Sequence, residues 1–187
     1  MIFGLRGSGK SNWLQWLLSE HEAYRNALVY DMCREHSGLD RYIPENRNGE
    51  EARTEAGEVV QRFIVDNARG LRPDLLVGEE LSRYAPNGGG TPDALMDLID
   101  LARHYNVGFI GVARRPAKVN TTLIELADNI LIFRLTGKRD VKRLNNEAPG
   151  AGDAARDLDE YHYLQIDQER RYTVHSPVPE MDTTGEL

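Results

Sequence analysis

The sequence predicts an α/β fold in which a mostly parallel central sheet is flanked by helices and ends in a C-terminal β-hairpin. Two observations lead to this class: short β-type runs alternate with helix-type runs along most of the chain, and the last two β-type runs alternate with period two. The length of 187 residues corresponds to one domain of ordinary size. We expect a single domain at residues 1–176 and an acidic, flexible tail at residues 177–187.

In the first half of the chain, apolar spacing defines the expected elements. They are a strand at residues 1–3, a helix from about residue 10 to residue 20, a strand at residues 27–30 and a helix with an apolar face at residues 59–68. Residues 33–55 are polar and contain glycine and proline, which predicts a long surface excursion. Gly70 is expected to end the second helix.

The second half repeats the alternation of strands and helices. The expected elements are strands at residues 75–77, 107–113 and 129–133, helices beginning near Asp93 and near Leu123, and a hairpin of strands at residues 161–166 and 171–175. The strand at residues 75–77 is short and wholly apolar, as is typical of a strand buried on both faces. Thr91-Pro92 before Asp93 is typical of a helix start.

Composition and charge exclude several classes of function. Lys and Arg number 23 against 30 Asp and Glu, so the net charge is −7 and the surface as a whole repels polyanions. Any contact with nucleic acid must therefore be a local basic patch. No apolar run reaches the roughly 18 residues of a membrane-spanning helix. The lone Cys33 cannot form an internal disulfide, which fits a reducing compartment, and we expect it to be an inert packing residue.

The strongest motif is the octapeptide Gly4-Leu5-Arg6-Gly7-Ser8-Gly9-Lys10-Ser11, which fits G-x-x-x-x-G-K-S/T, the phosphate-binding loop. It follows a predicted strand and opens a predicted helix, so backbone N–H groups and the positive helix end would face phosphate oxygens. Lys10 would reach the β and γ oxygens, and Ser11 would offer its hydroxyl to Mg²⁺. We expect ATP and Mg²⁺ as ligands; a glycine-rich turn without a ligand is the alternative. The residues expected to contact the nucleotide are Gly4, Arg6, Gly7, Ser8, Gly9, Lys10, Ser11 and Asn12.

Two carboxylates follow the strand at residues 75–77. A hydrolytic enzyme with a phosphate-binding loop needs one acid near Mg²⁺ and another that orients or deprotonates the attacking water. We assign the metal side, through water, to Glu79 and the polarisation of water to Glu80. A solvated acidic turn is the alternative for this segment.

Further motifs make the chain similar to a known superfamily. Residues 101–108, running into Arg115-Pro116, resemble the FtsK/HerA superfamily of ring-forming, DNA-pumping ATPases, which carry an arginine before a similar strand and Gln-Arg-Pro at its end. Residues 31–36 resemble the acidic motif of the same superfamily. The small size and the segments 38–44 and 133–138 narrow the likeness to genome-packaging ATPases of icosahedral viruses with an internal membrane, from archaeal or thermophilic bacterial hosts.

The resemblance covers residues 1–175 and implies a RecA-like P-loop NTPase of the ASCE type that assembles as a homo-oligomeric ring, a hexamer. Arg103 matches the arginine with which one subunit completes its neighbour's site, and Arg114 is the candidate sensor of the γ-phosphate. Glu79 stands where the superfamily usually has Asp, and Arg114 where relatives often have Gln. An arginine at a helix end and a surface salt bridge are the alternatives for Arg103 and Arg114.

The implied function is translocation of double-stranded DNA into a viral capsid, driven by ATP hydrolysis, in the host cytoplasm and at the packaging vertex of the virion. A capsid or membrane protein would recruit the motor, which does not itself span a membrane. Asp31 and Glu35 would couple the site to the ring interface or simply cap a loop. The densest basic stretches, candidates for DNA contact although such runs are usually solvated surface, contain Lys118, Lys138, Arg139, Lys142 and Arg143.

Three other functions stay open at this point. A small-molecule P-loop kinase would transfer phosphate to an acceptor and would need an acceptor pocket and a mobile lid; the contexts of Arg103 and Arg115-Pro116 disfavour it. Another DNA-translocating ATPase of the FtsK/HerA type would share every motif named above. A non-catalytic nucleotide-binding assembly factor would bind nucleotide tightly and turn it over slowly.

Overall fold

The computed structural model describes residues 1–21, 26–71 and 73–181, apart from the side chains of Arg103 and Tyr105. Its strands are β1 (Ile2–Phe3), β2 (Ala27–Tyr30), β3 (Arg41–Tyr42), β4 (Leu75–Gly78), β5 (Gly108–Ala113), β6 (Ile130–Phe133), β7 (Tyr163–Ile166) and β8 (Tyr172–His175). Its α-helices are α1 (Lys10–Glu20), α2 (Gly49–Ala68), α3 (Asp93–Tyr105), α4 (Thr121–Glu125), α5 (Lys138–Glu147) and α6 (Ala151–Arg156). None of these helices is both long and apolar enough to cross a membrane.

The strands form one sheet in the order β3-β2-β4-β5-β1-β6-β7-β8. All pairs from β3 to β6 are parallel, and β7 and β8 add an antiparallel hairpin. The predicted fold class is confirmed. In this order β5 lies between β1, which leads into the phosphate-binding loop, and β4, which leads into the two acids, so the carboxyl ends of these three strands meet at one edge of the sheet.

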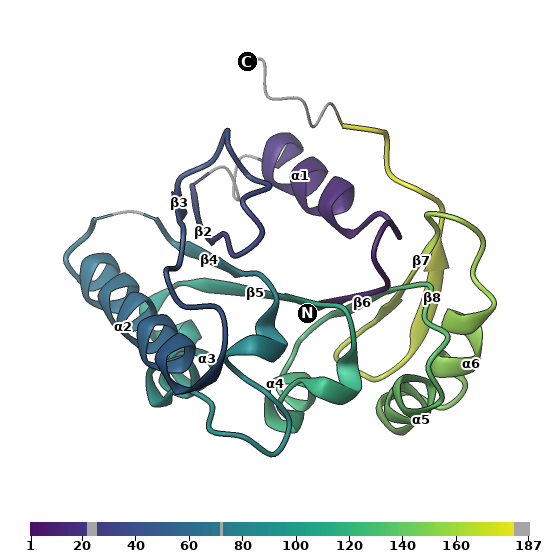
Figure 1. Ribbon diagram of the computed structural model, residues 1–187. Coiled ribbons are helices and arrows are strands. Elements are labelled where there is room, and N and C mark those ends of the chain that lie inside the picture. The colour runs from purple at the N-terminus through teal and green to yellow at the C-terminus, as the bar shows by residue number, and fades with distance from the viewer. Residues whose placement is uncertain (22–25, 72, 182–187) are drawn as a thin grey trace.

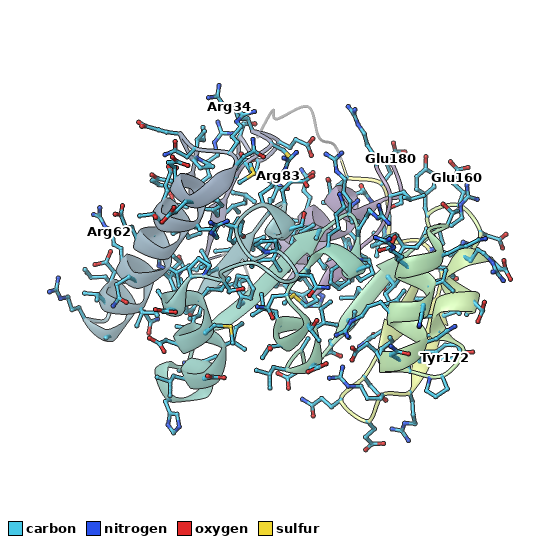
Figure 2. All side chains as sticks on the ribbon, turned by 60° about the horizontal axis from the view of Figure 1, so that its bottom comes forward. Arg34, Arg62, Arg83, Glu160, Tyr172 and Glu180 are labelled. Carbon is cyan, nitrogen blue, oxygen red and sulfur yellow. The ribbon has the colours of Figure 1, made fainter. Side chains whose placement is uncertain are left out.

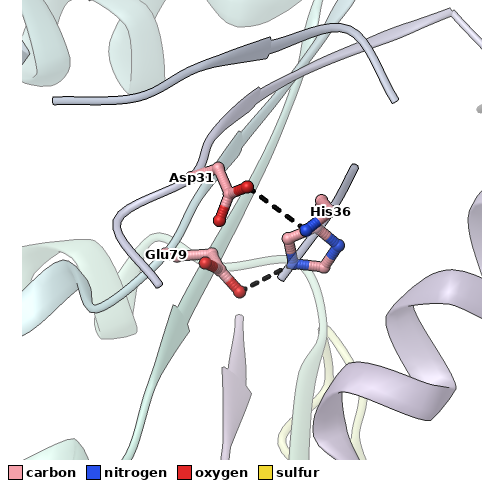
Figure 3. A group of neighbouring side chains, drawn as sticks. All are labelled: Asp31, His36 and Glu79. Atoms are coloured by element: carbon pink, nitrogen blue, oxygen red, sulfur yellow. Dashed lines mark hydrogen bonds and ion pairs between the residues drawn. The ribbon is translucent and has the colours of Figure 1, made fainter. Parts of the chain in front are cut away.

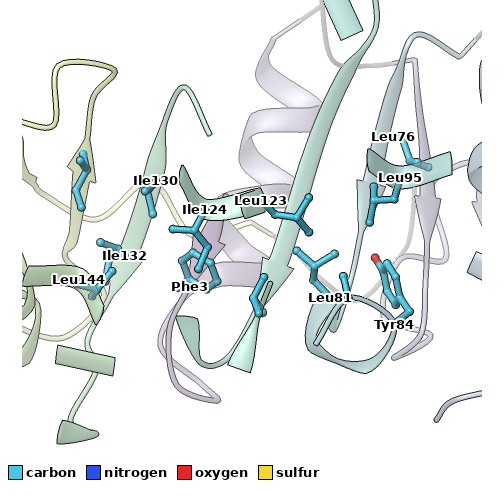
Figure 4. Packing of buried hydrophobic residues seen from close by; sticks show 14 of the residues in the cluster. Phe3, Leu76, Leu81, Tyr84, Leu95, Leu123, Ile124, Ile130, Ile132 and Leu144 are labelled. Atoms are coloured by element: carbon cyan, nitrogen blue, oxygen red, sulfur yellow. The ribbon is translucent and has the colours of Figure 1, made fainter. Parts of the chain in front are cut away.

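Helices cover both faces of the sheet (Figure 1). On one face, Trp13, Leu14 and Leu18 of α1 pack against β-strand residues that include Val77. On the other face, α2, α3 and α4 pack over residues such as Leu76, and α5 and α6 cover the hairpin end (Figure 4). Neighbouring residues of β4 thus point to opposite faces and are all buried, which explains why the strand is wholly apolar.

The predicted surface excursion at residues 33–55 is wrong in two places. β3 pairs with β2, and α2 begins at Gly49, well before the apolar face predicted for it. The first turns of α2 bury alanines and the carboxylate of Glu55, which accepts hydrogen bonds from the backbone N–H groups of Glu45 and Asn46 and from the Tyr42 hydroxyl, each at 2.8 Å. The hydrogen bond to Glu55 is the largest cause that raises the pKa of Tyr42 to about 12, and burial and nearby carboxylates add to it.

The start of the expected flexible tail is attached to the domain. The side-chain amide of Asn12 donates from Nδ2 to the carbonyl oxygen of Pro179 at 2.9 Å and accepts at Oδ1 from the N–H of Met181 at 2.7 Å. Val178 packs against the apolar cluster on the α1 face. Residues 178–181 therefore run back along the N-terminal end of α1, and residues 182–187 of the expected tail lie outside the described residues.

Candidate nucleotide-binding site

The loop between β1 and α1 has the backbone that its glycines predict. Gly7 and Gly9 have positive φ angles of 74° and 103°, a conformation that favours glycine. Trp13 N–H donates to the carbonyl of Gly9 at 2.9 Å, the first hydrogen bond of α1, so the N–H groups of the three preceding helical residues have no partner within the helix. The loop and the positive end of α1 thus face the carboxyl edge of the sheet and can receive an anion.

Lys10 lies at the centre of the charged groups at this edge. Its Nζ donates to the carbonyl oxygens of Gly4 and Leu5, each at 2.8 Å. Burial is the largest cause that lowers the Lys10 pKa, and the nearby Arg114 lowers it further, whereas Glu80 and two other carboxylates partly oppose the shift. The structure therefore brings the predicted lysine of the loop together with groups that follow β4 and β5.

The two acids after β4 have different environments, so the alternative of a solvated acidic turn is wrong. Glu79 is 5% exposed, and its Oε1 forms a hydrogen bond of 2.8 Å with Nε2 of His36 (Figure 3). Glu80 has a positive φ of 48°, which is uncommon for a residue with a side chain, and its Oε1 accepts a hydrogen bond of 2.7 Å from Nε of Arg114. Glu79 is thus a buried carboxylate held by a histidine, and Glu80 lies at the cleft beside an arginine.

Mg²⁺ fits the residues predicted to hold it. Oε2 of Glu79 is buried and has no hydrogen-bond partner among the described residues, so it has coordinating capacity left. The Ser11 hydroxyl donates to Oε2 of Glu35 at 3.3 Å, a long contact that can exchange. Ser11 and Glu79 would hold the ion, directly or through water, and it would neutralise charge on the β and γ phosphates.

Asp31, His36 and Glu79 place three potential metal-ligand atoms within 4.8 Å of one another, but Asp31 is already satisfied. Its carboxylate accepts hydrogen bonds from the N–H groups of Glu35 and His36, at 3.0 and 3.2 Å, and from Nη1 of Arg41 at 2.9 Å. Burial raises the pKa of Asp31, yet these hydrogen bonds outweigh it and hold the pKa below its usual value. Asp31 caps the loop after β2, which is the simpler of its two predicted roles.

The neighbouring residues Arg114 and Arg115 have different roles. Arg114 lines the cleft, whereas Nε of Arg115 donates to the buried Oδ2 of Asp140 at 2.9 Å. The other oxygen of Asp140 accepts the backbone N–H of Ala117 at 3.1 Å. Asp140, on α5, therefore fixes the turn that follows β5 and so positions Arg114; sequence analysis did not identify it because its partners lie more than twenty residues away.

The phosphate-binding loop, the two acids after β4 and Arg114 line one cleft of about 580 Å³. The predicted residues that line it are Arg6, Gly7, Lys10, Ser11, Glu35, Glu79, Glu80 and Arg114. It also contains residues that sequence analysis gave no role there, namely Arg47, Asn48 and Arg83. Cys33 is exposed at the same cleft, so its expected role in packing is wrong.

Five predicted site residues do not line the cleft, namely Gly4, Ser8, Gly9, Asn12 and Arg103. The Ser8 hydroxyl is buried and has no hydrogen-bond partner among the described residues. The Asn12 side chain holds the tail, so only its backbone N–H can face a phosphate. Arg103 lies near the end of α3, three residues before the loop that leads into β5, and its side chain is outside the described part of the structure. The neighbouring Ala102 lines a cavity with Met1 at the opposite edge of the sheet from the phosphate-binding loop.

The basic candidates for DNA contact differ in exposure. Lys118, Lys138, Arg139 and Lys142 are exposed. The Arg143 side chain is only 18% exposed and forms an ion pair of 2.7 Å with Glu147, so Arg143 has a structural role.

The fold is that of known P-loop ATPases. No protein-family model and no curated protein matches the sequence. Among solved structures, the chain is similar to the genome packaging NTPase B204 of Sulfolobus turreted icosahedral virus 2 in complex with sulfate, at a TM-score of 0.81 and 16% identity over 96% of both chains. The same NTPase in complex with ATP-gammaS matches at 0.78 and 15% identity, over 95% of this chain and 96% of that one.

More distant similarities extend beyond viruses. The N-terminal domain of zonular occludens toxin from Neisseria meningitidis matches at a TM-score of 0.58 and 13% identity, over 95% of this chain and 92% of that one. The type VII secretion ATPase EccC of Thermomonospora curvata matches at 0.59 and 13% identity, over 96% of this chain and 24% of that one. At these identities the likeness establishes the fold.

Proposed function

We propose that this chain is an ATPase of the FtsK/HerA type that couples ATP hydrolysis to translocation of double-stranded DNA into a viral capsid. The sequence motifs and the likeness to a genome packaging NTPase over nearly the whole of both chains support this role. That NTPase was solved in complex with an ATP analogue, which supports ATP as the ligand here. The same proposal places the protein in the host cytoplasm and at the packaging vertex, recruited by a capsid or membrane protein.

The observation that carries the proposal is the meeting of four charged groups in one cleft. Lys10 comes from the loop after β1, Glu79 and Glu80 follow β4, and Arg114 follows β5. This set matches the needs of phosphoryl transfer to water: a cation for the phosphates, an acid for Mg²⁺, an acid for water and a second cation for the charge on the transferred group.

The Arg114–Glu80 ion pair suggests that nucleotide must bind before Glu80 can act as a base. Nε of Arg114 donates to Oε1 of Glu80 at 2.7 Å, and the Arg114 side chain is 53% exposed. A γ-phosphate next to Lys10 attracts the Arg114 guanidinium, which leaves Glu80 free to accept a proton from the attacking water. Nucleotide binding would thus switch Glu80 from an ion-pair partner to a general base.

Assembly as a homo-oligomeric ring, a hexamer, completes the proposal. Because α3 ends at the edge of the sheet where the parallel strands begin, Arg103 is remote from the phosphate-binding loop of its own chain. We assign Arg103 to the nucleotide of the adjacent subunit, where it would stabilise charge on the transferred phosphoryl group. The exposed basic residues named above are the candidates for contact with DNA.

The variant Glu80→Gln tests the proposed role of Glu80 as the general base of ATP hydrolysis. The amide keeps the shape of the side chain but cannot accept the proton of water, so we expect ATP to bind and to turn over at least about 100-fold more slowly. Glu79→Gln is the matched comparison: it should raise the Mg²⁺ concentration needed for half-maximal hydrolysis. Phosphate release titrated against Mg²⁺ measures both effects. Normal turnover by Glu80→Gln would contradict its assignment, and exchanged phenotypes would reverse the two roles.

A further inference from the structure

The direction of a bound nucleotide follows from the charges in the cleft, given the proposed function on which this inference rests. The acids and Arg114 lie on the β4 and β5 side of the loop, so the γ-phosphate faces that side. The backbone N–H groups of the loop and of the first turn of α1 hold the α and β phosphates. The nucleoside must then leave the loop on its other side, toward β6 and β7.

An exposed tyrosine ring lies against the loop on that side. Tyr161, two residues before β7, is 51% exposed and has a positive φ of 61°. Its Cδ1 lies 3.3 Å from the position that a Cβ on Gly9 would take, and Phe133 of β6 is equally close to that position. The ring therefore lies next to the glycine that precedes Lys10, and it comes from the β6 and β7 side of the sheet, whereas the acids follow β4.

The attached part of the tail is held at the first turn of α1, next to the loop that the ring borders. Asn12, in the first turn of α1, holds Pro179 and Met181 through its side-chain amide. Glu160 is the largest cause of the raised Tyr161 pKa, and Glu180 of the tail contributes to it, so the tail lies within electrostatic reach of Tyr161. Figure 2 shows Glu160 and Glu180 toward the right of the view and Arg34 and Arg83 further to the left. Arg83 lines the cleft together with the two acids.

We infer that Tyr161 and the strap at residues 178–181 form the subsite for the nucleobase. The base stacks on the exposed Tyr161 ring, as bases stack on aromatic side chains elsewhere. Residues 178–181, here called the strap, are fixed to α1 by Asn12 and form one wall of the subsite. Since every base has a π face, stacking alone gives affinity for the nucleoside, and the carboxylates of Glu160 and Glu180 are acceptors for amino groups on its edge.

The test compares ATP with inorganic tripolyphosphate, which has the same phosphate chain and no base. Both are titrated in the presence of Mg²⁺ against the full chain and its Tyr161→Ala variant, with Tyr161→Phe as the conservative variant. We expect Tyr161→Ala to raise the Kd of ATP about 10- to 100-fold, to leave the Kd of tripolyphosphate within about 2-fold, and to be rescued by Tyr161→Phe. Tyr172→Ala, at an exposed tyrosine of β8, is the matched control and should bind both ligands normally.

A second variant tests the strap. Asn12→Ala keeps the backbone N–H but releases Pro179 and Met181, so ATP should bind several-fold more weakly and tripolyphosphate should bind as before. Unchanged ATP affinity in Tyr161→Ala, or equal loss for both ligands, would overturn the nucleobase subsite while leaving the phosphate site in place. If the unmodified chain binds neither ATP nor tripolyphosphate, the proposed function fails instead.

Discussion

Lys10→Ala should reduce ATP hydrolysis at least about 100-fold and leave the fold intact. The ammonium group is the cation of the loop that can reach the β and γ phosphates, and in a partly desolvated site its attraction is too strong for neighbours to replace. Among the described residues, its Nζ donates hydrogen bonds to the carbonyls of Gly4 and Leu5, which water can satisfy after the substitution. Phosphate release and circular dichroism measure the two parts of this expectation.

Lys142→Ala is the matched control for Lys10→Ala, because it removes the same charge from an exposed position on α5. Without DNA, its rate of hydrolysis should equal that of the unmodified chain. A folded Lys10→Ala protein with near-normal turnover would refute the assignment of the phosphate-binding loop.

Arg103→Ala should slow hydrolysis by up to about 10³- to 10⁵-fold without abolishing nucleotide binding. The proposed finger stabilises charge that develops only in the transition state, and the phosphate-binding loop of the variant remains complete. Arg62→Ala is the control: the Arg62 side chain is 84% exposed on α2 and forms a surface pair with Asp66, which is worth little. ATP binding and single-turnover hydrolysis distinguish loss of chemistry from loss of affinity.

Mixing Arg103→Ala with Lys10→Ala subunits tests whether the finger acts between subunits. A Lys10→Ala subunit still has Arg103 and can offer it to an Arg103→Ala neighbour whose phosphate-binding loop is complete, so mixed rings should recover part of the activity. If Arg103 acted within its own chain, each site would lack one part and no activity would return. Mixed rings shown to form by mass and yet inactive would contradict the ring mechanism.

The parts of the fold and site that sequence could predict are those encoded locally. The phosphate-binding loop, α1 and the strands around it were predicted because glycine spacing and runs of large apolar residues mark them. α6 was missed because its buried residues are Ala151, Gly152 and Ala155, which give little apolar periodicity. The N-terminal turns of α2 were missed for the same reason. The helix α5 is mostly polar, and its buried residues are Leu144 and the ion-paired Asp140, so it has no apolar face that its sequence could reveal.

The remaining site features depend on contacts between distant parts of the chain. Glu79 meets His36 across 43 positions, and Asn12 meets Met181 across 169. Such contacts are set by the packing of the sheet and by the path of the tail, which no local pattern specifies. The acidic, proline-containing composition of residues 177–187 is typical of a flexible tail, and the asparagine whose side chain holds residues 179 and 181 lies at the other end of the sequence.

The most direct test of the central claim is phosphate release from ATP by the purified chain, with and without duplex DNA, in the absence of any other acceptor. If the chain is a DNA-translocating ATPase, duplex DNA should accelerate its hydrolysis of ATP. In the Lys10→Ala control, duplex DNA should not increase the rate of phosphate release. Hydrolysis that duplex DNA leaves unchanged, or phosphate transferred to a small molecule instead of water, would contradict it.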